Sequence, residues 1–223
     1  MTTSTIDPLP VTGESGKPGR NCSRCPRLKA FRADCRRREP TWFNAPVPSF
    51  GPLTARLLIV GLAPGLQGAN RTGRPFTGDY AGVLLYDTLS RYDFARGRYQ
   101  AHPEDGLELV DARITNAVRC VPPQNKPTGS EIATCRVFLR ATIAEMPKLR
   151  AIVVLGRIAH DSVLAALDHR AKAAAFGHGS AHEIGKLRLF CSYHCSRLNT
   201  NTGVLTPEMF REVFSNVRRY LDA

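Results

Sequence analysis

A continuous apolar run, RLLIVG at Arg56 to Gly61, constrains the fold of this chain more than any other feature of its sequence. Strands with one face in water alternate apolar and polar residues, whereas a strand without this alternation is buried on both faces. Such strands occur in parallel sheets that helices cover on both sides. The run therefore predicts an α/β protein with a parallel sheet.

Three further runs have the character of strands, and helical patterns separate them. The predicted strands are Arg56 to Gly61, Arg113 to Val118, Ala151 to Leu155 and Leu187 to Ser192. The predicted helices are Tyr80 to Arg91, Ser130 to Glu145 with an SEIA start signal, Ile158 to Ala166, and Glu208 to Leu221 after Thr206-Pro207. This alternation predicts a three-layer α/β/α sandwich with a central, mostly parallel four-stranded sheet. Ligands bind at the carboxyl ends of such strands, so we expect the function in the loops that follow them.

The chain before the first strand differs in composition from the rest. Residues 1–19 are polar and rich in Pro, Gly, Ser and Thr, which predicts a disordered leader without the apolar core of a signal peptide. Within Cys22 to Arg38 a helix is expected beyond Pro26, because proline is tolerated in a first helical turn. Eight of the nineteen residues from Arg20 to Arg38 are basic. We therefore expect a single domain over residues 20–223 that includes this basic helix.

The charge balance indicates a polyanionic partner. Lys and Arg number 31 against 19 Asp and Glu, which gives a net charge of +12. A field of this sign attracts nucleic acid, although a basic protein from a GC-rich genome would show the same balance. The longest apolar stretches, such as Leu57 to Ala63, are far shorter than the roughly 20 residues that span a bilayer. We expect a cytoplasmic protein without membrane contact, and nucleic acid as the first candidate partner.

The densest cluster of unusual residues follows the first predicted strand directly: GLAPGLQGANRTGRPFTGD, Gly61 to Asp79. Its five glycines leave backbone amides free to approach a ligand. The segment lacks the GK[ST] of a phosphate-binding loop, and its glycines do not fit GxGxxG. Binding of a nucleotide cofactor is therefore not indicated.

This segment closely resembles the first motif of the type 5 group of the uracil-DNA glycosylase superfamily, GLAPGxxGxNRTGRxFTGD. RITNAVRCVPPQNKPT at Arg113 to Thr128 continues the resemblance, and YHCSRLNTNTGVLT at Tyr193 to Thr206 is similar to the family's second motif. The three segments agree in order and cover the chain from about Cys22 to its end. The resemblance implies the uracil-DNA glycosylase fold. It also implies a DNA-repair enzyme that flips uracil, and other deaminated bases such as hypoxanthine or xanthine, out of DNA and hydrolyses the N-glycosidic bond.

The implied reaction needs an anion near the sugar and a donor near the leaving base, because positive charge builds on the first and negative charge on the second. Asp79 is the only carboxylate of the first loop, and the resemblance implies that it positions water or stabilises the oxocarbenium ion. An Asp before a helix also predicts an N-cap, and both roles can coexist. Ala63 stands where related families carry a polar catalytic residue, which leaves this task to Asp79. His194 should donate to the base oxygen as negative charge grows.

Residues of three segments are implied to contact the base. Phe76 should stack on it, with a plain core Phe as the alternative. Asn116, at the end of the second predicted strand, should pair with the base edge through its amide and is counted as catalytic with Asp79 and His194; a turn Asn is the alternative. The implied base-binding residues are Gly61, Ala63, Gly65, Phe76, Asn116, Asn125 and His194.

The second motif is implied to enter the DNA helix. Its loop should fill the space that the flipped nucleotide vacates, and arginines of the first motif should meet phosphates, with a solvated surface charge as the alternative. The implied DNA contacts are Arg71, Arg74, Ser196, Arg197, Leu198 and Asn199. The family's usual HPS reads His194-Cys195-Ser196 here, so the fixed φ angle of proline is lost from this loop.

Seven cysteines, an odd number that begins with a CxxC pair, indicate metal or redox chemistry before structural disulfides. The resemblance implies a [4Fe-4S] cluster that ties the basic helix to the sheet, with zinc as the alternative metal. Its implied ligands are Cys22, Cys25, Cys120 and Cys135. Cys35 is close enough in sequence to compete as a ligand. Cys191 is expected to be buried on a strand.

The interpretation that results is a monomeric, monofunctional glycosylase with a water nucleophile, since Lys126 is the only lysine in the three segments. One alternative is a non-catalytic iron-sulfur DNA-binding protein on the same fold. The joint presence of Asp79, Asn116 and His194 disfavours it. Another is a family member that traps the sugar covalently through a histidine, but no His lies between Asp79 and Arg98. We expect the protein in a bacterial or archaeal cytoplasm, where it acts at the nucleoid. Its expected partner is DNA that contains uracil or another deaminated base.

Overall fold

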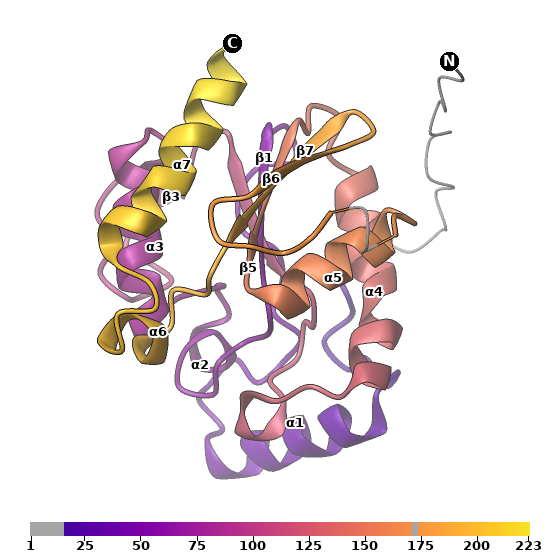
Figure 1. Cartoon of the computed structure of the whole chain (residues 1–223). Coiled ribbons are helices and arrows are strands. Elements are labelled where there is room, and N and C mark those ends of the chain that lie inside the picture. Colours follow the sequence, from indigo (N-terminus) through magenta and orange to yellow (C-terminus); the bar gives the residue numbers. More distant parts are fainter. Residues whose placement is uncertain (1–15, 171–173) are drawn as a thin grey trace.

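A five-stranded sheet forms the centre of the computed structural model, which describes residues 16–170 and 174–223 (Figure 1). In spatial order the strands are β4 (Ala112–Asn116), β1 (Leu57–Gly61), β5 (Ala151–Leu155), β7 (Leu187–Ser192) and β6 (Ala181–Ile184). The first four pair in parallel, and they are the four strands that the sequence predicts. β6 pairs antiparallel to β7 at one edge. The predicted count of four is one strand short, because β6 is brief and has a single buried residue, so no apolar run marks it.

Helices surround the sheet and carry the connections between its strands. They are α1 (Pro26–Arg38), α2 (Ala69–Thr72), α3 (Tyr80–Arg91), the 3-10 turn η1 (Pro123–Asn125), α4 (Gly129–Ala144), α5 (Arg157–Ala166), α6 (Arg197–Asn201) and α7 (Pro207–Asp222). Two short strands, β2 (Ala95–Arg96) and β3 (Glu108–Leu109), form a separate antiparallel pair. None of the helices within the described residues is long and apolar enough to cross a membrane.

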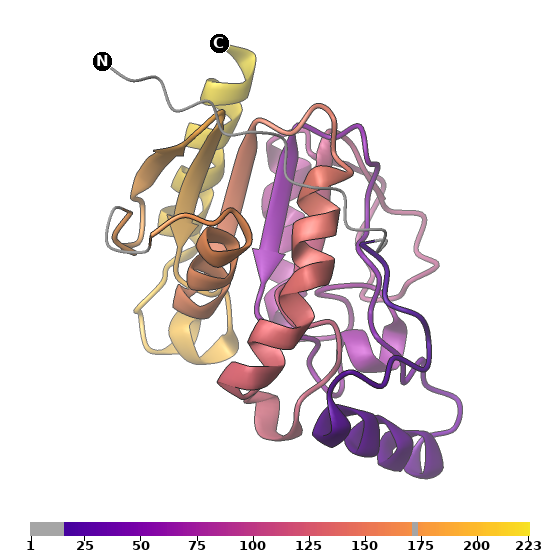
Figure 2. The same ribbon diagram turned by 90° about the vertical axis from the view of Figure 1, so that its right-hand side faces the viewer.

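The apolar run of β1 is continuous because its residues enter two different cores. Leu57 and Ile59 pack with side chains of α3 and α7 on one face of the sheet. Leu58 and Val60 pack with side chains of α4 and α5 on the other. Figure 2 shows helices on both sides of the sheet. The predicted three-layer α/β/α sandwich is therefore confirmed.

The predicted helix starts agree with the structure to within one or two residues. Asp79 caps α3, and its side chain accepts a hydrogen bond from the Gly82 amide. α4 is capped by Thr128 in a capping box with Glu131, so the start signal lies before Ser130.

The N-terminal part of the chain packs on the sheet through α1 and the residues before it. α1 begins at Pro26, as predicted, and buries Leu28, Arg32 and Cys35. The predicted leader over residues 1–19 falls mainly on residues 1–15, which lie outside the described residues. Gly16 is buried and its amide donates to Glu145 Oε1 at 2.9 Å, so the packed part of the chain begins no later than this residue.

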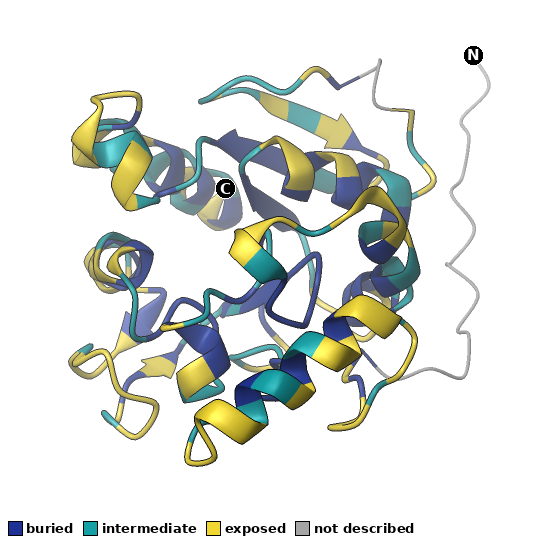
Figure 3. Cartoon of the chain, turned by 90° about the horizontal axis from the view of Figure 1, so that it is seen from below, coloured by how far each residue is buried: buried dark blue, intermediate teal, exposed yellow. Residues whose placement is uncertain are grey.

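The carboxyl ends of the parallel strands all meet one end of the molecule, the lower end in Figure 1. α1, α2 and α6 lie at this end. Seen from there in Figure 3, α1 and α6 show exposed residues at the periphery, while buried loops lie between them. The fold thus directs the loops after β1, β4 and β7 to one rim.

Candidate active site

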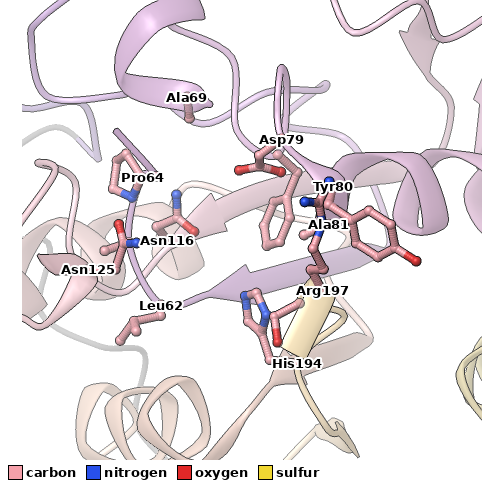
Figure 4. A pocket seen from close by; sticks show the side chains of 14 residues that line it. Leu62, Pro64, Ala69, Asp79, Tyr80, Ala81, Asn116, Asn125, His194 and Arg197 are labelled. Atoms are coloured by element: carbon pink, nitrogen blue, oxygen red, sulfur yellow. The ribbon is translucent and has the colours of Figure 1, made fainter. Parts of the chain in front are cut away.

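A pocket of about 390 Å³ opens at this rim, where the predicted site residues meet (Figure 4). Its walls come from the glycine-rich loop after β1, the end of β4, η1, and the loop after β7. The predicted residues that line it are Ala63, Gly65, Phe76, Asp79, Asn116, Asn125, His194, Ser196 and Arg197. Asp79 and His194, which are far apart in sequence, therefore border one cavity.

Asp79 both caps a helix and faces the pocket. Its Oδ1 accepts from the Gly82 amide at 3.2 Å. Its Oδ2 lies so close to Gly68 that a Cβ atom on that residue would collide with it, which explains a glycine at this position. Burial raises the pKa of the Asp79 carboxyl, and the amides of Gly82 and Ala81 partly oppose this rise. The cap expected from the sequence is confirmed, and it leaves the carboxylate at the pocket wall.

Asn116 offers the pocket an amide without a partner. The residue is 4% exposed, and Oδ1 has no hydrogen bond within the described residues. A buried acceptor left unsatisfied costs about 1–3 kcal/mol, so this oxygen is suited to a donor on a bound molecule. Gly61 stands beside Asn116 in the register of β1 and β4. It does not line the pocket, but a Cβ there would strike Asn116 Oδ1 and the Phe76 ring, so its role is to leave room for both.

Two rings border the cavity. Phe76 is 7% exposed and has a positive φ of 53°, which is rare for a residue with a side chain. The His194 ring lies 5.9 Å from it between centroids, with an interplanar angle of 28°. Burial lowers the pKa of His194 to about 4, so the imidazole is neutral at pH 7 and can donate from one ring nitrogen.

The segment predicted to enter DNA is a capped helical turn rather than an open loop. Ser196 caps α6 through the Asn199 amide, and the Asn199 side chain donates to the His194 carbonyl at 2.8 Å. Asn199 therefore holds the His194 loop and does not line the pocket. Leu198 is 72% exposed, a large apolar side chain at the molecular surface. Arg197 lies over the Tyr80 ring at 5.2 Å, at the side of the pocket away from Asn116.

The predicted phosphate contact of Arg74 is wrong. Its side chain is buried, and both terminal nitrogens bind the carboxylate of Asp105 at 2.8 Å. The guanidinium also lies over the rings of Phe50 and Tyr86, at 5.2 and 5.4 Å. The sequence could not show this, because Asp105 lies in a loop outside the three motifs. Arg71 is exposed, so its contact with phosphate stays a prediction.

Further residues line the pocket that sequence reasoning did not single out. They are Leu62, Pro64, Ala69, Tyr80 and Ala81. Each lies within or directly next to the first motif, so adjacency to Asp79 and to the glycines was the signal that could have found them. Asn125 is exposed and has a positive φ of 57° in η1, which turns the chain back to the pocket rim.

A second, smaller pocket brings together Cys22, Cys25, Cys120 and Cys135. Arg32 and Arg119 also line it. Within the part of the chain that the structure describes, no group of three or more His, Cys, Asp or Glu side chains is arranged to hold a metal ion. Soft thiolates suit iron-sulfur chemistry.

The other cysteines lie outside this small pocket. Cys35 is buried on α1 and does not line it. Cys191 is fully buried on β7, as expected. Cys195 is fully buried as well, with its thiol 3.5 Å from the Ala81 carbonyl, so it packs behind the active pocket in the place of the usual proline.

The fold and the main pocket define a class: an α/β protein with a pocket at the carboxyl edge of its sheet, bordered by a carboxylate, an amide and an imidazole. The sequence profile of the Uracil DNA glycosylase superfamily matches residues 48–218. The chain belongs to this superfamily, and the resemblance to its type 5 group is confirmed by its relatives.

The relatives are similar over most of their length. A Type-5 uracil-DNA glycosylase of Thermus thermophilus is 44% identical over 205 residues, which cover 89% of this chain and 93% of that protein. A Type-5 uracil-DNA glycosylase of Pyrobaculum aerophilum is 43% identical, with 86% of each chain covered. A Type-4 uracil-DNA glycosylase of the same organism is 33% identical over 69% of this chain and 64% of its own.

Proposed function

We propose that this protein is a DNA-repair N-glycosylase that takes uracil out of DNA and hydrolyses its N-glycosidic bond, leaving an abasic site. The superfamily membership and the Type-5 relatives support this activity. The observation that carries the mechanism is the buried Oδ1 of Asn116, a residue that lines the pocket; this oxygen has no hydrogen-bond partner within the described residues.

The edge of uracil complements the Asn116 amide. The base has an N–H donor at N3 beside the carbonyl oxygen O4. Asn116 Oδ1 accepts from N3 and its Nδ2 donates to O4, so one amide satisfies both groups. Phe76 contributes an aromatic face for the ring, and Ala63 and Gly65 line the pocket without bulk.

The two ionisable groups act on opposite charges of the transition state. His194 is neutral at pH 7 and donates to the base oxygen O2, a hydrogen bond that strengthens as negative charge builds on the departing base. Asp79 lies across the pocket and directs its carboxylate at the sugar, where it orients water and stabilises the oxocarbenium ion. Water is the nucleophile, and the enzyme is monofunctional.

Other deaminated bases suit the same contacts. Hypoxanthine and xanthine carry an N–H at N1 beside the carbonyl at C6, which is the pattern that Asn116 matches on uracil. A volume of about 390 Å³ leaves room for a bicyclic base. We therefore include these purines in the proposed substrate range.

The surface around the pocket is proposed to hold DNA. Leu198 stands at the tip of α6 and enters the base stack where the flipped nucleotide was, as apolar wedges do in other DNA-bending proteins. The phosphate backbone is met by Ser196 and Arg197 at the start of α6 and by Arg71 on α2. The protein is proposed to act as a monomer in the cytoplasm.

The cysteine pocket is proposed to hold a [4Fe-4S] cluster on Cys22, Cys25, Cys120 and Cys135. Its surroundings suit a group of negative charge: Arg32 donates to Cys120 Sγ at 3.0 Å, and the Arg119 amide donates to Cys135 Sγ at 3.3 Å. Both guanidinium groups are buried, and neither forms a salt bridge with a carboxylate among the described residues. Because a buried charge without a counter-ion is strongly destabilising, four metal-bound thiolates are the fitting partner.

When bound, the cluster would cross-link the segment before α1 to the loop after β4 and to α4, and no step of the hydrolysis would use it. The purified protein is expected to be brown and to absorb visible light, and Cys120→Ala should remove the colour while Cys35→Ala retains it. A colourless protein with stoichiometric zinc would support the alternative metal.

One assay tests the function as a whole. The protein is incubated with oligonucleotides that each carry uracil, hypoxanthine or xanthine, and abasic sites are then cleaved with alkali. Alkali-dependent cleavage of the uracil strand is expected, and no cleavage before alkali if the enzyme is monofunctional. DNA binding without any base release would favour the non-catalytic alternative.

A further inference from the structure

The turn that carries Phe76 has a conformation that its own sequence does not explain. Phe76 adopts a φ of 53° and Gly78 a φ of 89°, so two of the three residues between Pro75 and Asp79 lie in the left-handed region. A non-glycine residue is held there only where the surrounding structure fixes it. The residues that fix this turn therefore also set the direction of the Phe76 ring and the start of Asp79.

One hydroxyl spans the turn. Tyr99 Oη donates to the Phe76 carbonyl at 3.1 Å and accepts from the Gly78 amide at 3.3 Å. The backbone groups on both sides of Thr77 are thus bound to a single atom of a distant residue. Tyr99 does not line the pocket within the described structure.

The first turn of α3 is shaped to admit this hydroxyl. A Cβ atom on Gly82 would collide with both the Phe76 carbonyl oxygen and Tyr99 Oη. Gly82 is also the residue whose amide donates to Asp79 Oδ1. Gly82 therefore contacts three features at once: the Tyr99 hydroxyl, the Phe76 turn and the Asp79 cap.

Neighbouring side chains hold Tyr99 in place. Its ring stacks on Tyr86 at 4.6 Å between centroids, and the Tyr86 hydroxyl donates to the Pro75 carbonyl at 2.7 Å. Asp105 accepts from the Gln100 amide at 2.9 Å while it binds Arg74, so the loop that carries Tyr99 is tied to the first motif.

We propose that Tyr99 is a positioning residue for base excision, whose hydroxyl fixes the turn that aims Phe76 at the base and Asp79 at the sugar. This inference rests on the proposed function. Tyr99 touches no reacting atom and acts through the two residues that border the pocket. Because misplacement of a reacting group by about 1 Å can slow a reaction about a hundredfold, loss of one hydroxyl is expected to be visible in the chemical step.

The test compares Tyr99→Phe, Phe76→Leu and the double variant with the unchanged protein. The measurements are the single-turnover rate of uracil release, the dissociation constant for the uracil-containing duplex, and the unfolding midpoint. Tyr99→Phe is expected to release uracil about tenfold or more slowly with little change in DNA affinity. In the Phe76→Leu background the same substitution should have a clearly smaller effect, because the ring that the turn aims is gone and only the direction of Asp79 remains to be lost.

Tyr220→Phe is the matched control, since Tyr220 lies on α7 with its ring against Phe190 and should leave the rate unchanged. A Tyr99→Phe variant with a lower unfolding midpoint but the rate of the unchanged protein would overturn the proposal, as it would show a structural role alone. Fully multiplicative effects of the two substitutions would overturn it as well. Absence of base release by the unchanged protein would instead remove the proposed function.

Discussion

The Phe76 ring and the His194 imidazole lie almost parallel, at 5.9 Å between centroids and 28° between planes. Two stacking gaps of about 3.5 Å each need about 7 Å, so a base does not fit between the two faces in this arrangement. A base on Phe76 must therefore meet His194 at its edge, where the carbonyl oxygen lies. In the proposed function the two rings therefore have different tasks: Phe76 is a stacking surface and His194 a hydrogen-bond donor.

Asp79→Asn separates the two roles of that residue. Asparagine is as good an N-cap as aspartate, so α3 should stay intact. The raised pKa of Asp79 means that the ionised carboxylate destabilises the folded state at pH values above that pKa, so the neutral amide should leave the unfolding midpoint equal or higher. Uracil release should fall by at least about a hundredfold.

The measurements for this variant are single-turnover release and thermal unfolding. Asp79→Ala serves as the comparison, because it also loses the cap and should lose about 1 kcal/mol of stability. Unchanged release by Asp79→Asn would remove the carboxylate from the mechanism.

His194 should give the enzyme a flat pH dependence through neutrality. Its folded-state pKa of about 4 lies below the ordinary 6.5, so the donor stays neutral from pH 8 down to about pH 5. The folded protein binds fewer protons at His194 than the unfolded chain does. The neutral imidazole therefore contributes fully to the stability of the fold above pH 6.5, and this contribution declines as the pH falls toward 4. A pH-rate profile with a step near 6.5 that His194→Gln abolishes would contradict this assignment.

Asp105→Asn should destabilise the protein although it is remote from the pocket. The substitution leaves the Arg74 guanidinium buried without its counter-charge, a loss of about 3–5 kcal/mol. Arg74 holds the pKa of Asp105 well below its ordinary value of 3.8. The carboxylate therefore stabilises the fold fully at pH values above 3.8, and this contribution is lost as the pH falls through the lowered pKa. Denaturant unfolding at pH 7 and pH 3 should show a smaller difference between the two proteins at the lower pH. Equal stability at pH 7 would refute the ion pair.

Arg71→Ala should change how DNA affinity depends on salt. If this exposed arginine meets one phosphate, the slope of log K against log salt should decrease by about 1. Arg140→Ala is a suitable control, because Arg140 lies on α4 and pairs with Asp168. An unchanged slope for Arg71→Ala would place the residue away from the backbone of DNA.

The parts of the molecule that local sequence determines were predictable, and the parts that depend on distant partners were not. β1 and β5 have the apolar runs of doubly buried strands, and α3 begins where an Asp cap precedes an amphipathic stretch. β6 lacks such a pattern because it is an edge strand that exists through its pairing with β7.

The site follows the same division. Asp79, Asn116 and His194 follow predicted strands or lie in motifs, so their meeting at one rim could be foreseen. Arg74 was misassigned, because an arginine in a loop gives no sign that a carboxylate 31 residues away will bury it. Tyr99 stands in no motif, and only the folded chain shows what its hydroxyl binds.

Because the pocket carboxylate is also the first hydrogen-bond acceptor of α3, that wall of the cavity cannot swing outward without unwinding a helix packed on the sheet. α6, by contrast, is a single turn at the pocket rim, and the Asn199 side chain ties it to the His194 loop. We therefore expect that α6 moves when a nucleotide rotates out of its duplex into the pocket, while the Asp79 carboxylate keeps its position.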